Sequence, residues 1–534
     1  MVQSLRAFNR AFHPPLAIDK ATDKLQAQVP QPADRMADLG TVFLDAAERH
    51  FDRPAFISDD QTLTFCDLRD MTYEYAYELL ESLDWSAGSC VALQLENSAD
   101  YIAAFYGILI AGGVVIPLPT SQTESWVNSI LQATSARWII DKGGLHSCVP
   151  VGATNDLESY DDRSDLYVRG LATIFFTSGS SGTPKGVMLS HANLLMNAAS
   201  IQRSLPIEPT DRTLAILPFC LAFGNSVLHS HLLCGAALVV AGSTTFPETL
   251  IASMKTHGVT SFSGVPQLHQ LIFRGSSISS AMVPSLRYVT VAGGALRSDL
   301  ITEFAARIAP AEFFVMYGQT EATARLSCLP SGQLYGRCGS IGHGLPGVTL
   351  QVVDESGDEV LPGTQGEIRA RGGNIMLGYW NDQEATDEVL RSGWLYTGDL
   401  ATVDEDGYIY PQGRKSQLLK IAGYRLHPAE IEAAITKSMP AVEAGVVPFE
   451  SVDGLQRIAM FAFPLRSDVL PDMHNLRICC KCQLARFQRP DYIAVLEHPP
   501  LMPSLKIDRQ KLSRWAADAV RQPSKSRVMD SVSG

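Results

Sequence analysis

The chain of 534 residues is predicted to adopt an α/β fold, on two observations. Helical patterns alternate with short β-branched runs from about residue 39 to residue 345, which is typical of βα units built on parallel sheets. After about residue 345 the strand-like runs are separated by Asp/Gly turns, at 354–357 and 404–407, which indicates a small antiparallel β unit. The sequence therefore predicts parallel-sheet βα subdomains, a small β-barrel-like unit and a final α+β segment.

The expected elements follow one another along the chain. Helices are expected at 42–50, 100–110 and 509–520. Strands of the first part are expected at 55–57, 91–94, 172–176, 214–217, 237–240, 261–263, 288–291 and 313–315. Strands of the antiparallel unit are expected at 348–353, 367–371 and 401–403.

This pattern divides the chain into four parts. Residues 1–38 lack periodicity and contain proline breakers, so an irregular lead-in is expected there. Residues 39–413 form a large N-terminal domain whose β-rich subdomain covers about 345–413, and residues 414–522 form a small C-terminal domain. The polar tail, 523–534, is expected to fray.

One stretch, Tyr101–Pro119, is uncharged over a length close to that of a membrane span. Gly112 and Gly113 interrupt it, and a β-branched run follows them. That order favours a buried helix, a glycine turn and a buried strand over a membrane helix. The N-terminus lacks a continuous apolar segment of the kind found in secretory signals, so a soluble cytoplasmic protein is expected.

The net charge and the cysteine spacing limit the kinds of ligand that this chain is expected to bind. The formal net charge is −13 and the sequence pI is about 5.4, which argues against binding to the nucleic-acid backbone. A small anionic ligand can still bind where a few N–H groups and cations are well placed. The ten cysteines are scattered without zinc-ligand spacing, so reduced thiols are expected.

The strongest chemical signal is the segment 176–186. A hydrophobic strand runs into a loop of glycines and small hydroxyl residues that ends in a lysine. Glycines let backbone N–H groups point at an anion, and the lysine adds a positive charge. The spacing is not that of a Walker A loop, and an ordinary surface turn is the alternative. The phosphate-binding candidates are Thr177, Ser178, Gly179, Ser180, Ser181, Gly182, Thr183 and Lys185.

Four further elements follow this loop in order. They are the aromatic-Gly-x-Thr-Glu segment 317–321, the Thr-Gly-Asp segment 397–399, the region 413–425 with Gly413-Arg414 and Lys420, and the late lysine segment 503–509. Together with the loop they resemble the signatures of the adenylate-forming acyl-activating enzymes, which include acyl-CoA synthetases, peptide-synthetase adenylation domains and luciferases. The resemblance covers about residues 40–515, and the five elements jointly are far more specific than any one of them.

The resemblance implies an ATP site with Mg²⁺. Glu321 is expected to hold the metal, a hard ion that prefers oxygen ligands. Asp399 is expected to accept hydrogen bonds from the ribose hydroxyls, and Arg414 to reach the ribose or the phosphates. Tyr317 is expected to face the adenine. Further nucleotide-binding positions implied are Gly293, Gly294, Ala295, Gly318, Gln319 and Thr320.

The family resemblance also implies that the C-terminal domain adopts two orientations, one for each half-reaction. Lys506, together with Glu321, Thr177 and Lys185, is the expected catalytic set for adenylation. The small domain then rotates about a hinge at Ser416 and presents the loop of Lys420 and Gly423 to the acceptor. Two departures fall here: the family usually has Asp or Lys at the hinge, and usually Gly where this chain has Leu505.

The acyl pocket is expected to be apolar or small-sided. Its candidates are Phe219, Cys220, Phe223, Gly224, Asn225, Val265 and Gly294. No carboxylate stands in 223–226 to pair a substrate ammonium, so a neutral-tailed aliphatic, alicyclic or aryl acid is favoured over an α-amino acid. Cys220 stands in an element where the family often carries histidine.

Four functions remain open. The favoured one is an ATP-dependent ligase that forms an acyl-adenylate and passes the acyl group to a thiol, either coenzyme A or the pantetheine of a carrier protein in trans. The second uses an amine acceptor, as amide ligases resembling the coronafacate or aminocoumarin ligases do. The third is a nucleotide-binding protein without catalysis. The fourth, a membrane protein, rests only on the stretch discussed above.

Overall fold

The computed structural model of the chain describes most of its length. The described residues are 38–82, 85–148, 170–178, 184–241, 247–276, 278–294, 296–415, 419–421, 424–451, 456–465, 470–502 and 506–521. Nearly all of the predicted lead-in and the whole tail therefore lie outside the described residues. So do part of the phosphate loop (179–183), the hinge at Ser416 and the position of Leu505.

The described residues contain two large sheets. The first has seven strands in the order β18 (Gly378–Tyr379), β8 (Pro184–Ser190), β7 (Leu171–Ser178), β4 (Val114–Pro117), β3 (Cys90–Leu93), β5 (Trp138–Asp141) and β6 (Gly144–Ser147). Its central pairs, β7 with β4, β4 with β3 and β3 with β5, are parallel. The hairpin of β7 and β8 is antiparallel and carries the phosphate loop between its strands.

The second sheet has nine strands. Their order is β15 (His343–Gly344), β14 (Ser327–Leu329), β13 (Glu312–Tyr317), β12 (Tyr288–Val291), β11 (Ser261–Gly264), β9 (Arg212–Leu214), β10 (Ala237–Val239), β1 (Pro54–Ile57) and β2 (Thr62–Thr64). The strands from β13 to β1 run parallel. The α/β class predicted from the sequence is confirmed.

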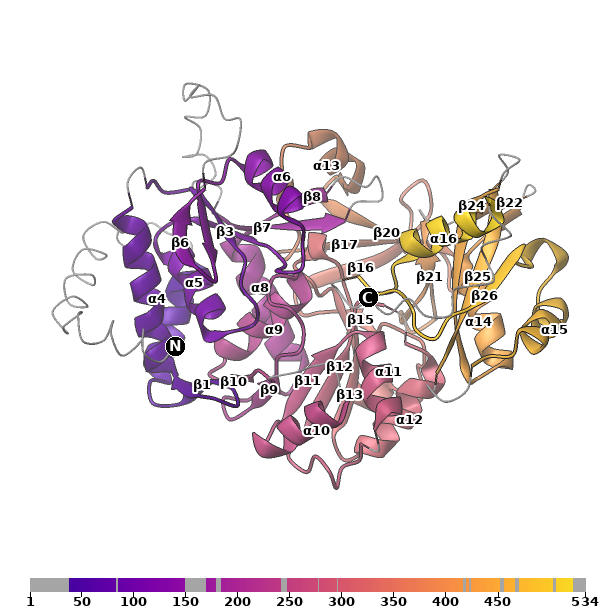
Figure 1. The fold of residues 1–534 in the computed structure, drawn as a ribbon, viewed down its shortest axis with the longest axis horizontal. Helices are drawn as coiled ribbons and strands as arrows, with labels where there is room; N and C mark the ends of the chain where they lie inside the picture. The colour runs from indigo at the N-terminus through magenta and orange to yellow at the C-terminus, as the bar shows by residue number, and fades with distance from the viewer. Residues whose placement is uncertain are drawn as a thin grey trace.

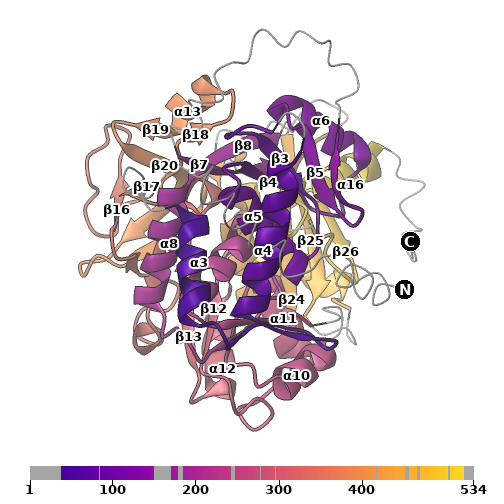
Figure 2. The same ribbon diagram turned by 90° about the vertical axis from the view of Figure 1, so that its left-hand side faces the viewer.

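A layer of helices lies between the two sheets. It consists of α3 (Leu39–Arg49), α4 (Phe65–Leu80), α5 (Ala99–Ile110), α8 (His191–Ser204) and α9 (Ala222–Leu232). One buried cluster joins these helices to strands of both sheets. Helix α5 is buried from Tyr101 to Leu109, and Ala99 is buried as well, which is what an almost uniformly apolar helix requires. Figure 2 shows α3, α4 and α5 in the middle of this body.

Other helices cover the outer faces. Helix α6 (Glu124–Thr134) packs on the first sheet, and α10 (Pro247–Thr256), α11 (Pro266–Gly275) and α12 (Ser298–Ile308) pack on the second. No helix among the described residues combines the length and the apolar character that a bilayer crossing needs. The stretch 101–119 is α5, a glycine turn and β4, as the sequence predicts.

A smaller antiparallel unit follows. Its strands are β16 (Val348–Val353), β17 (Gly366–Gly372), β20 (Trp394–Val403), β19 (Leu390–Arg391) and β21 (Ile409–Arg414), and α13 (Gln383–Val389) packs beside it. All of its strand pairs are antiparallel. The predicted antiparallel β unit is therefore confirmed.

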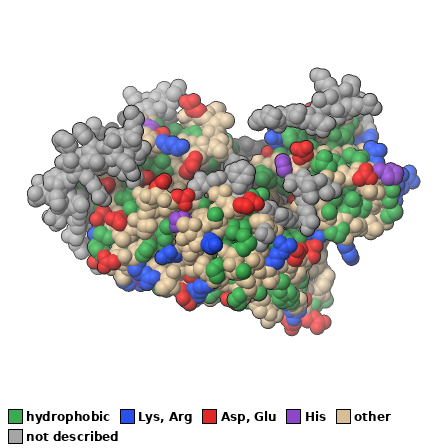
Figure 3. Space-filling view, turned by 60° about the horizontal axis from the view of Figure 1, so that its bottom comes forward, with side chains coloured by type: hydrophobic (Ala, Val, Ile, Leu, Met, Phe, Trp, Pro, Cys, Tyr) green, Lys and Arg blue, Asp and Glu red, His purple; other side chains and the backbone are tan. Residues whose placement is uncertain are grey.

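The C-terminal part is drawn in orange and yellow in Figure 1. It contains the hairpin of β22 (Leu419–Ile421) and β23 (Tyr424–Leu426), the sheet of β24 (Val442–Glu450), β25 (Gln456–Pro464) and β26 (Tyr492–Val495), and the helices α14 (Pro428–Ser438), α15 (Met473–Gln483) and α16 (Arg509–Arg521). Separate apolar clusters lie on the two faces of this sheet. On the face of the molecule in Figure 3, acidic and basic side chains are intermixed.

The predicted strand at 214–217 is wrong beyond its first residue, because β9 ends at Leu214. Asn97 explains the difference. Its side-chain amide donates to the carbonyl oxygens of Ala215 and Leu217, and its Oδ1 accepts from the N–H of Phe219. One partly buried side chain thus takes hydrogen-bonding groups that a longer strand would use in a ladder.

Buried histidines tie the helical layer to the second sheet, and they make stability depend on pH. His231 is 1% exposed; its Nδ1 lies 2.8 Å from the Val227 carbonyl and its Nε2 lies 2.9 Å from the Tyr288 hydroxyl. Because the carbonyl can only accept, Nδ1 carries the proton and Nε2 accepts from the tyrosine. Burial lowers the pKa of His231 to about 4.

Replacing His231 should therefore reduce the loss of folding stability that occurs as the pH falls below 7. As pH falls from 7 to 5, the unfolded histidine gains a proton and the folded one does not, so the native state loses about 2 kcal/mol. We expect the Tm drop between pH 7 and pH 5 to be about 2–4 °C smaller in His231→Gln than in the unmodified chain, measured by thermal unfolding. The exposed His146→Gln serves as the control; equal drops in all three proteins would contradict the assignment.

Candidate active site

The phosphate loop is framed by the hairpin of β7 and β8. Thr177 pairs with Lys185 across this hairpin, and the Thr177 hydroxyl donates to the Lys185 carbonyl oxygen at 3.4 Å. Ser178 pairs through its backbone with Pro184. The predicted positions Gly179, Ser180, Ser181, Gly182 and Thr183 lie outside the described residues. The hairpin thus brings the two ends of the candidate loop side by side.

Tyr379 connects this loop to Glu321. The Lys185 ammonium lies 5.0 Å from the centroid of the Tyr379 ring, and the Tyr379 hydroxyl donates to Glu321 Oε1 at 2.9 Å. Burial, and then the Glu321 carboxylate, raise the pKa of this phenol, so it stays protonated and remains a donor. Sequence reasoning missed Tyr379; the Gly-Tyr-Trp segment at 378–380 was the available signal.

A tight turn after β13 carries Glu321. Gly318 is required there, because a Cβ at this position would lie 1.9 Å from the Ala324 carbonyl oxygen. The Gln319 carbonyl accepts from the N–H groups of Ala322 and Ala324, which closes the turn. Thr320 begins its short 3₁₀ segment, Thr320–Ala322. The turn therefore fixes the direction in which the carboxylate leaves the sheet.

The donor chemistry at Glu321 fits a magnesium ion bound mainly through phosphate. Mg²⁺ usually takes one or two protein carboxylates and completes its shell with substrate phosphates and water. Across the described part of the chain, no three acidic, histidine or cysteine side chains converge into a metal cage. A single carboxylate close to the phosphate loop is compatible with the first arrangement and not with an all-protein site.

Asp399 is held between a tyrosine and an arginine. The Tyr317 hydroxyl donates to Asp399 Oδ2 at 2.6 Å, and Arg414 Nε donates to Asp399 Oδ1 at 3.0 Å. Asp399 and Arg414 are also cross-strand partners on β20 and β21. The Asp399 charge raises the pKa of Arg414, and burial followed by Asp399 raises that of Tyr317. A carboxylate has about four acceptor positions, so two remain for hydroxyl groups of a ligand.

Lys506 reaches this site from the C-terminal part. A Cβ built on Gly293 would lie 3.5 Å from Lys506 Cε and 3.9 Å from Nζ, so glycine leaves room for the lysine tip. Desolvation and then the Arg414 charge lower the pKa of Lys506, while Asp399 and Glu321 oppose this. A second bridge between the two parts joins Arg297 to the Pro440 carbonyl oxygen at 3.0 Å.

The remaining C-terminal candidates lie elsewhere. Lys420 is on β22, where its backbone pairs with Arg425, and the hairpin packs near β25. Figure 1 places β22 at the outer end of the molecule, away from β13 and β15. Gly423 and Ser416 lie outside the described residues. The structure thus brings Lys506, and not Lys420, to Asp399 and Glu321.

The predicted acyl-pocket residues divide into two groups. Val265 borders Gly293 beside Lys506, and Gly294 is exposed next to it. Phe219 and Cys220 belong instead to the core between the sheets, where the Phe219 ring lies 5.6 Å from that of Tyr101. Asn97 holds the loop 215–219 through hydrogen bonds to Ala215, Leu217 and Phe219, and this loop directs Phe219 and Cys220 into the core.

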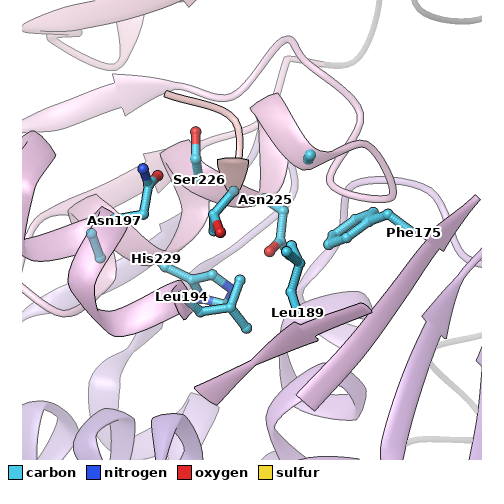
Figure 4. Close-up of a pocket in the computed structure, with 10 residues that line it drawn as sticks. Phe175, Leu189, Leu194, Asn197, Asn225, Ser226 and His229 are labelled. Atoms are coloured by element: carbon cyan, nitrogen blue, oxygen red, sulfur yellow. The ribbon is translucent and has the colours of Figure 1, made fainter. Parts of the chain in front are cut away.

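Asn225 faces a small enclosed cavity, whose lining is shown in Figure 4. The cavity has a volume of about 10 Å³, close to the space for one water molecule. Among the described residues, both polar atoms of the Asn225 side chain, Asn197 Oδ1 and His229 Nε2 are buried without a hydrogen-bond partner. Gly224 precedes Asn225 at a close backbone approach, since a Cβ there would lie 2.1 Å from the Pro218 carbonyl oxygen. Polar atoms around such a space suit one bound water.

Together, a phosphate-type loop with a lysine, a carboxylate for a hard metal ion and a carboxylate–arginine pair for hydroxyl groups define a nucleotide-binding site. Comparison with known proteins agrees. The family model described as AMP-binding enzyme matches residues 43–380, so the chain belongs to the AMP-binding enzyme family.

Relatives with known names extend over nearly the whole chain. A long-chain-fatty-acid–CoA ligase of Salmonella typhimurium is 26% identical over 536 residues, covering 90% of this chain and 94% of the relative. A 2-succinylbenzoate–CoA ligase of Bacillus cereus is 28% identical, covering 86% and 95%.

Solved structures show the same fold. The o-succinylbenzoate CoA synthetase of Bacillus subtilis in complex with AMP has a TM-score of 0.74 at 25% identity and covers 88% of this chain and 97% of that one. ATP-bound MatB from Rhodopseudomonas palustris has a TM-score of 0.77 at 23% identity, covering 91% and 100%.

The Asp399 arrangement can be tested against a near-identical group in the same β unit. Asp399→Asn should weaken binding of AMP about 10- to 100-fold, because it removes a charged acceptor, measured by isothermal titration calorimetry. Asp404 also accepts from a tyrosine, Tyr410, and an arginine, Arg337, and is the matched control. Asp404→Asn should leave the affinity for AMP unchanged; equal losses in both variants would show a general effect on the β unit.

Proposed function

We propose that this protein uses ATP to adenylate a carboxylic acid and then transfers the acyl group to a thiol, coenzyme A or a carrier-bound pantetheine. The observation that carries the proposal is the position of Lys506, whose tip lies against Gly293 and whose charge interacts with those of Arg414, Asp399 and Glu321. These residues come from both large structural parts. A site that only stored a nucleotide would not need a lysine brought in from the segment between β26 and α16 of the C-terminal part.

In the first step, an oxygen of the substrate carboxylate attacks the α-phosphorus of ATP. The bond from that phosphorus to the bridging oxygen breaks, and pyrophosphate leaves with the electron pair. The barrier comes largely from crowded negative charge, so positioned cations lower it. Lys506 is the cation for the carboxylate and α-phosphate, and Lys185 with the loop holds the leaving phosphates. A magnesium ion at Glu321 would neutralise phosphate charge when bound.

The nucleotide is oriented by the β unit and the β13 turn. Asp399 would accept from the ribose hydroxyls while Arg414 and Tyr317 hold its carboxylate in place. Gly293, Gly294 and the segment 317–320 would border the base, and Ala295 lies next to them in sequence. Tyr379 would keep Glu321 oriented through its hydrogen bond. These roles follow the geometry and the family resemblance together.

The thiol acceptor is favoured because the named relatives described above are CoA ligases. In the second step the sulfur attacks the acyl carbonyl, the thiol loses its proton, and AMP leaves. Transfer to an amine, giving an amide, is the alternative. The position of Lys420 at the outer end of the molecule supports a rotation about the region of Ser416, which would bring the Lys420 and Gly423 loop to the site in exchange for Lys506.

The proposal is tested by acid-dependent exchange of pyrophosphate into ATP. The panel contains aliphatic, alicyclic, aryl and α-amino acids, with no acceptor present. We expect exchange with at least one non-amino acid, and release of AMP when coenzyme A is added to that acid. Exchange that continues unchanged with coenzyme A but yields product with an amine would favour the amide ligase. Absence of exchange in folded, ATP-binding protein would overturn the proposal.

Lys506→Ala should separate the two half-reactions. Adenylate formation should fall about 100-fold or more, because the cation at the crowded carboxylate and α-phosphate is lost. Thiol transfer from preformed acyl-adenylate should stay within a few-fold of the unmodified protein. The two rates are measured by pyrophosphate exchange and by single-turnover transfer. Lys511→Ala, on the adjoining helix α16 and stacked over Trp515, is the control and should leave both rates unchanged. Equal losses in both half-reactions of Lys506→Ala would refute the role.

A further inference from the structure

Arg325 lies in the core of the second sheet. It is 0% exposed and follows the turn that carries Glu321. Its guanidinium donates to Met316 Sδ at 3.0 Å and to Ser263 Oγ at 3.4 Å, and it lies 4.9 Å from the centroid of the Phe223 ring. A sulfur, a hydroxyl at long distance and an aromatic face are weak partners for a full positive charge.

No carboxylate among the described residues forms an ion pair with Arg325. Other partly buried arginines do have such partners, as Arg287 has Asp211 and Arg509 has Glu432. The Arg325 Nε is buried without a hydrogen-bond partner in the same part of the chain. Burial lowers its pKa to about 10, which leaves the group protonated at neutral pH. A buried charge without a counter-charge costs several kcal/mol, so a position of this kind requires a reason.

The position of Arg325 relative to Lys506 offers a reason for this buried charge. Lys506 lies against Gly293, just past the end of β12, and Val265, just past the end of β11, borders the same glycine. Arg325 lies against Ser263, and Thr290 donates to the same Ser263 hydroxyl, further back along these two strands. Two to three residues of extended chain separate the two contacts, which corresponds to about 7–10 Å. Phe223, an expected acyl-pocket residue, lies over the guanidinium.

We propose that Arg325 binds a second carboxylate at the tail of the substrate, so that the preferred acids are dicarboxylates whose two carboxylates are separated by about 7–10 Å. This inference rests on the proposed function and replaces the neutral tail expected from the sequence. The reacting carboxylate would lie at Lys506, and the tail carboxylate would supply the counter-charge that the protein does not. Arg325 is then a specificity-determining residue, with no part in the bond changes.

The test compares matched acids that differ only at the tail. The pairs are suberate with octanoate, pimelate with heptanoate, and 1,4-phenylenediacetate with 4-methylphenylacetate; the monomethyl ester of each diacid adds an uncharged carbonyl. For at least one pair, kcat/KM in pyrophosphate exchange should be about 10- to 100-fold higher for the diacid than for the monoacid and the ester, as expected for a charged hydrogen bond. The difference should lie mainly in KM, because the contact is far from the reacting atoms.

Arg325→Met keeps an unbranched side chain, two atoms shorter, and removes its charge. We expect it to abolish the preference for the diacid and to leave kcat with the monoacid unchanged. Without substrate its Tm should be equal to or above that of the unmodified protein, because an unpaired buried charge has been removed. The diacid should raise the Tm of the unmodified protein but not of the variant. Arg325→Lys keeps the charge and should retain part of the preference.

Arg307→Met is the matched control. Arg307 also lies over a phenylalanine, Phe273, at 4.0 Å, but it is paired with Glu303 on α12, on the other face of the sheet. It should not change the order of the acids. A lower Tm in Arg325→Met with an unchanged preference would show that Arg325 is only structural and would overturn the inference. Preference for monoacids in the unmodified protein would overturn it as well, while leaving the proposed function intact. Exchange with no acid would overturn both.

Discussion

The site depends on the buried side chain of Asn374, which holds the turn after β13. Its side-chain amide donates to the carbonyl oxygens of Ala322 and Arg325 at 3.1 and 3.0 Å, and the backbone carbonyl oxygen of Asn374 accepts from the Thr323 hydroxyl. The turn needs this support, because Thr323 and Ala324 have φ angles of 55° and 81°, a region that costs residues with a Cβ about 1–3 kcal/mol. Glu321 and Arg325 take their directions from a strained turn that a single amide keeps in place.

The same contacts join separate layers of the fold. Asn197 of α8 donates to the Arg325 carbonyl, and Asn193 of α8 donates to the carbonyls of Gly373 and Ile375, on either side of Asn374. The chain then runs into β18, which pairs with β8 of the first sheet and carries Tyr379. Lys185 from the first sheet and Glu321 from the second therefore meet at Tyr379 because one helix between the sheets is bonded to both.

The sequence predicts the fold well and locates the family motifs, but it does not predict the interactions between the motif residues. Alternation of apolar runs located most of the strands, because burial on both faces of a parallel sheet leaves a local pattern. The stretch 215–217 has that pattern as well, yet Asn97, more than a hundred residues away, takes its hydrogen-bonding groups. Tyr379 and Arg325 could not be found in the same way, since their importance lies in what they face across the core. An arginine in a segment such as 322–327 is by composition a surface residue.

Three residues around this turn, Tyr317, Glu321 and Arg325, face three different parts of the proposed site. Tyr317 at the end of β13 faces the group that would hold the ribose, Glu321 in the turn faces the phosphate loop, and Arg325 beyond it faces the layer between β11 and α9. Under the two proposals, a single segment of nine residues would contribute to binding of the nucleotide, the metal and the far end of the acid. Because these three directions are fixed by one turn, a change that relaxes Thr323 or Ala324 would shift the metal carboxylate and the tail guanidinium together. Under both proposals, a change in the backbone of this turn would therefore alter adenylation chemistry and acid selectivity together, whereas a change confined to the Arg325 side chain would alter selectivity alone.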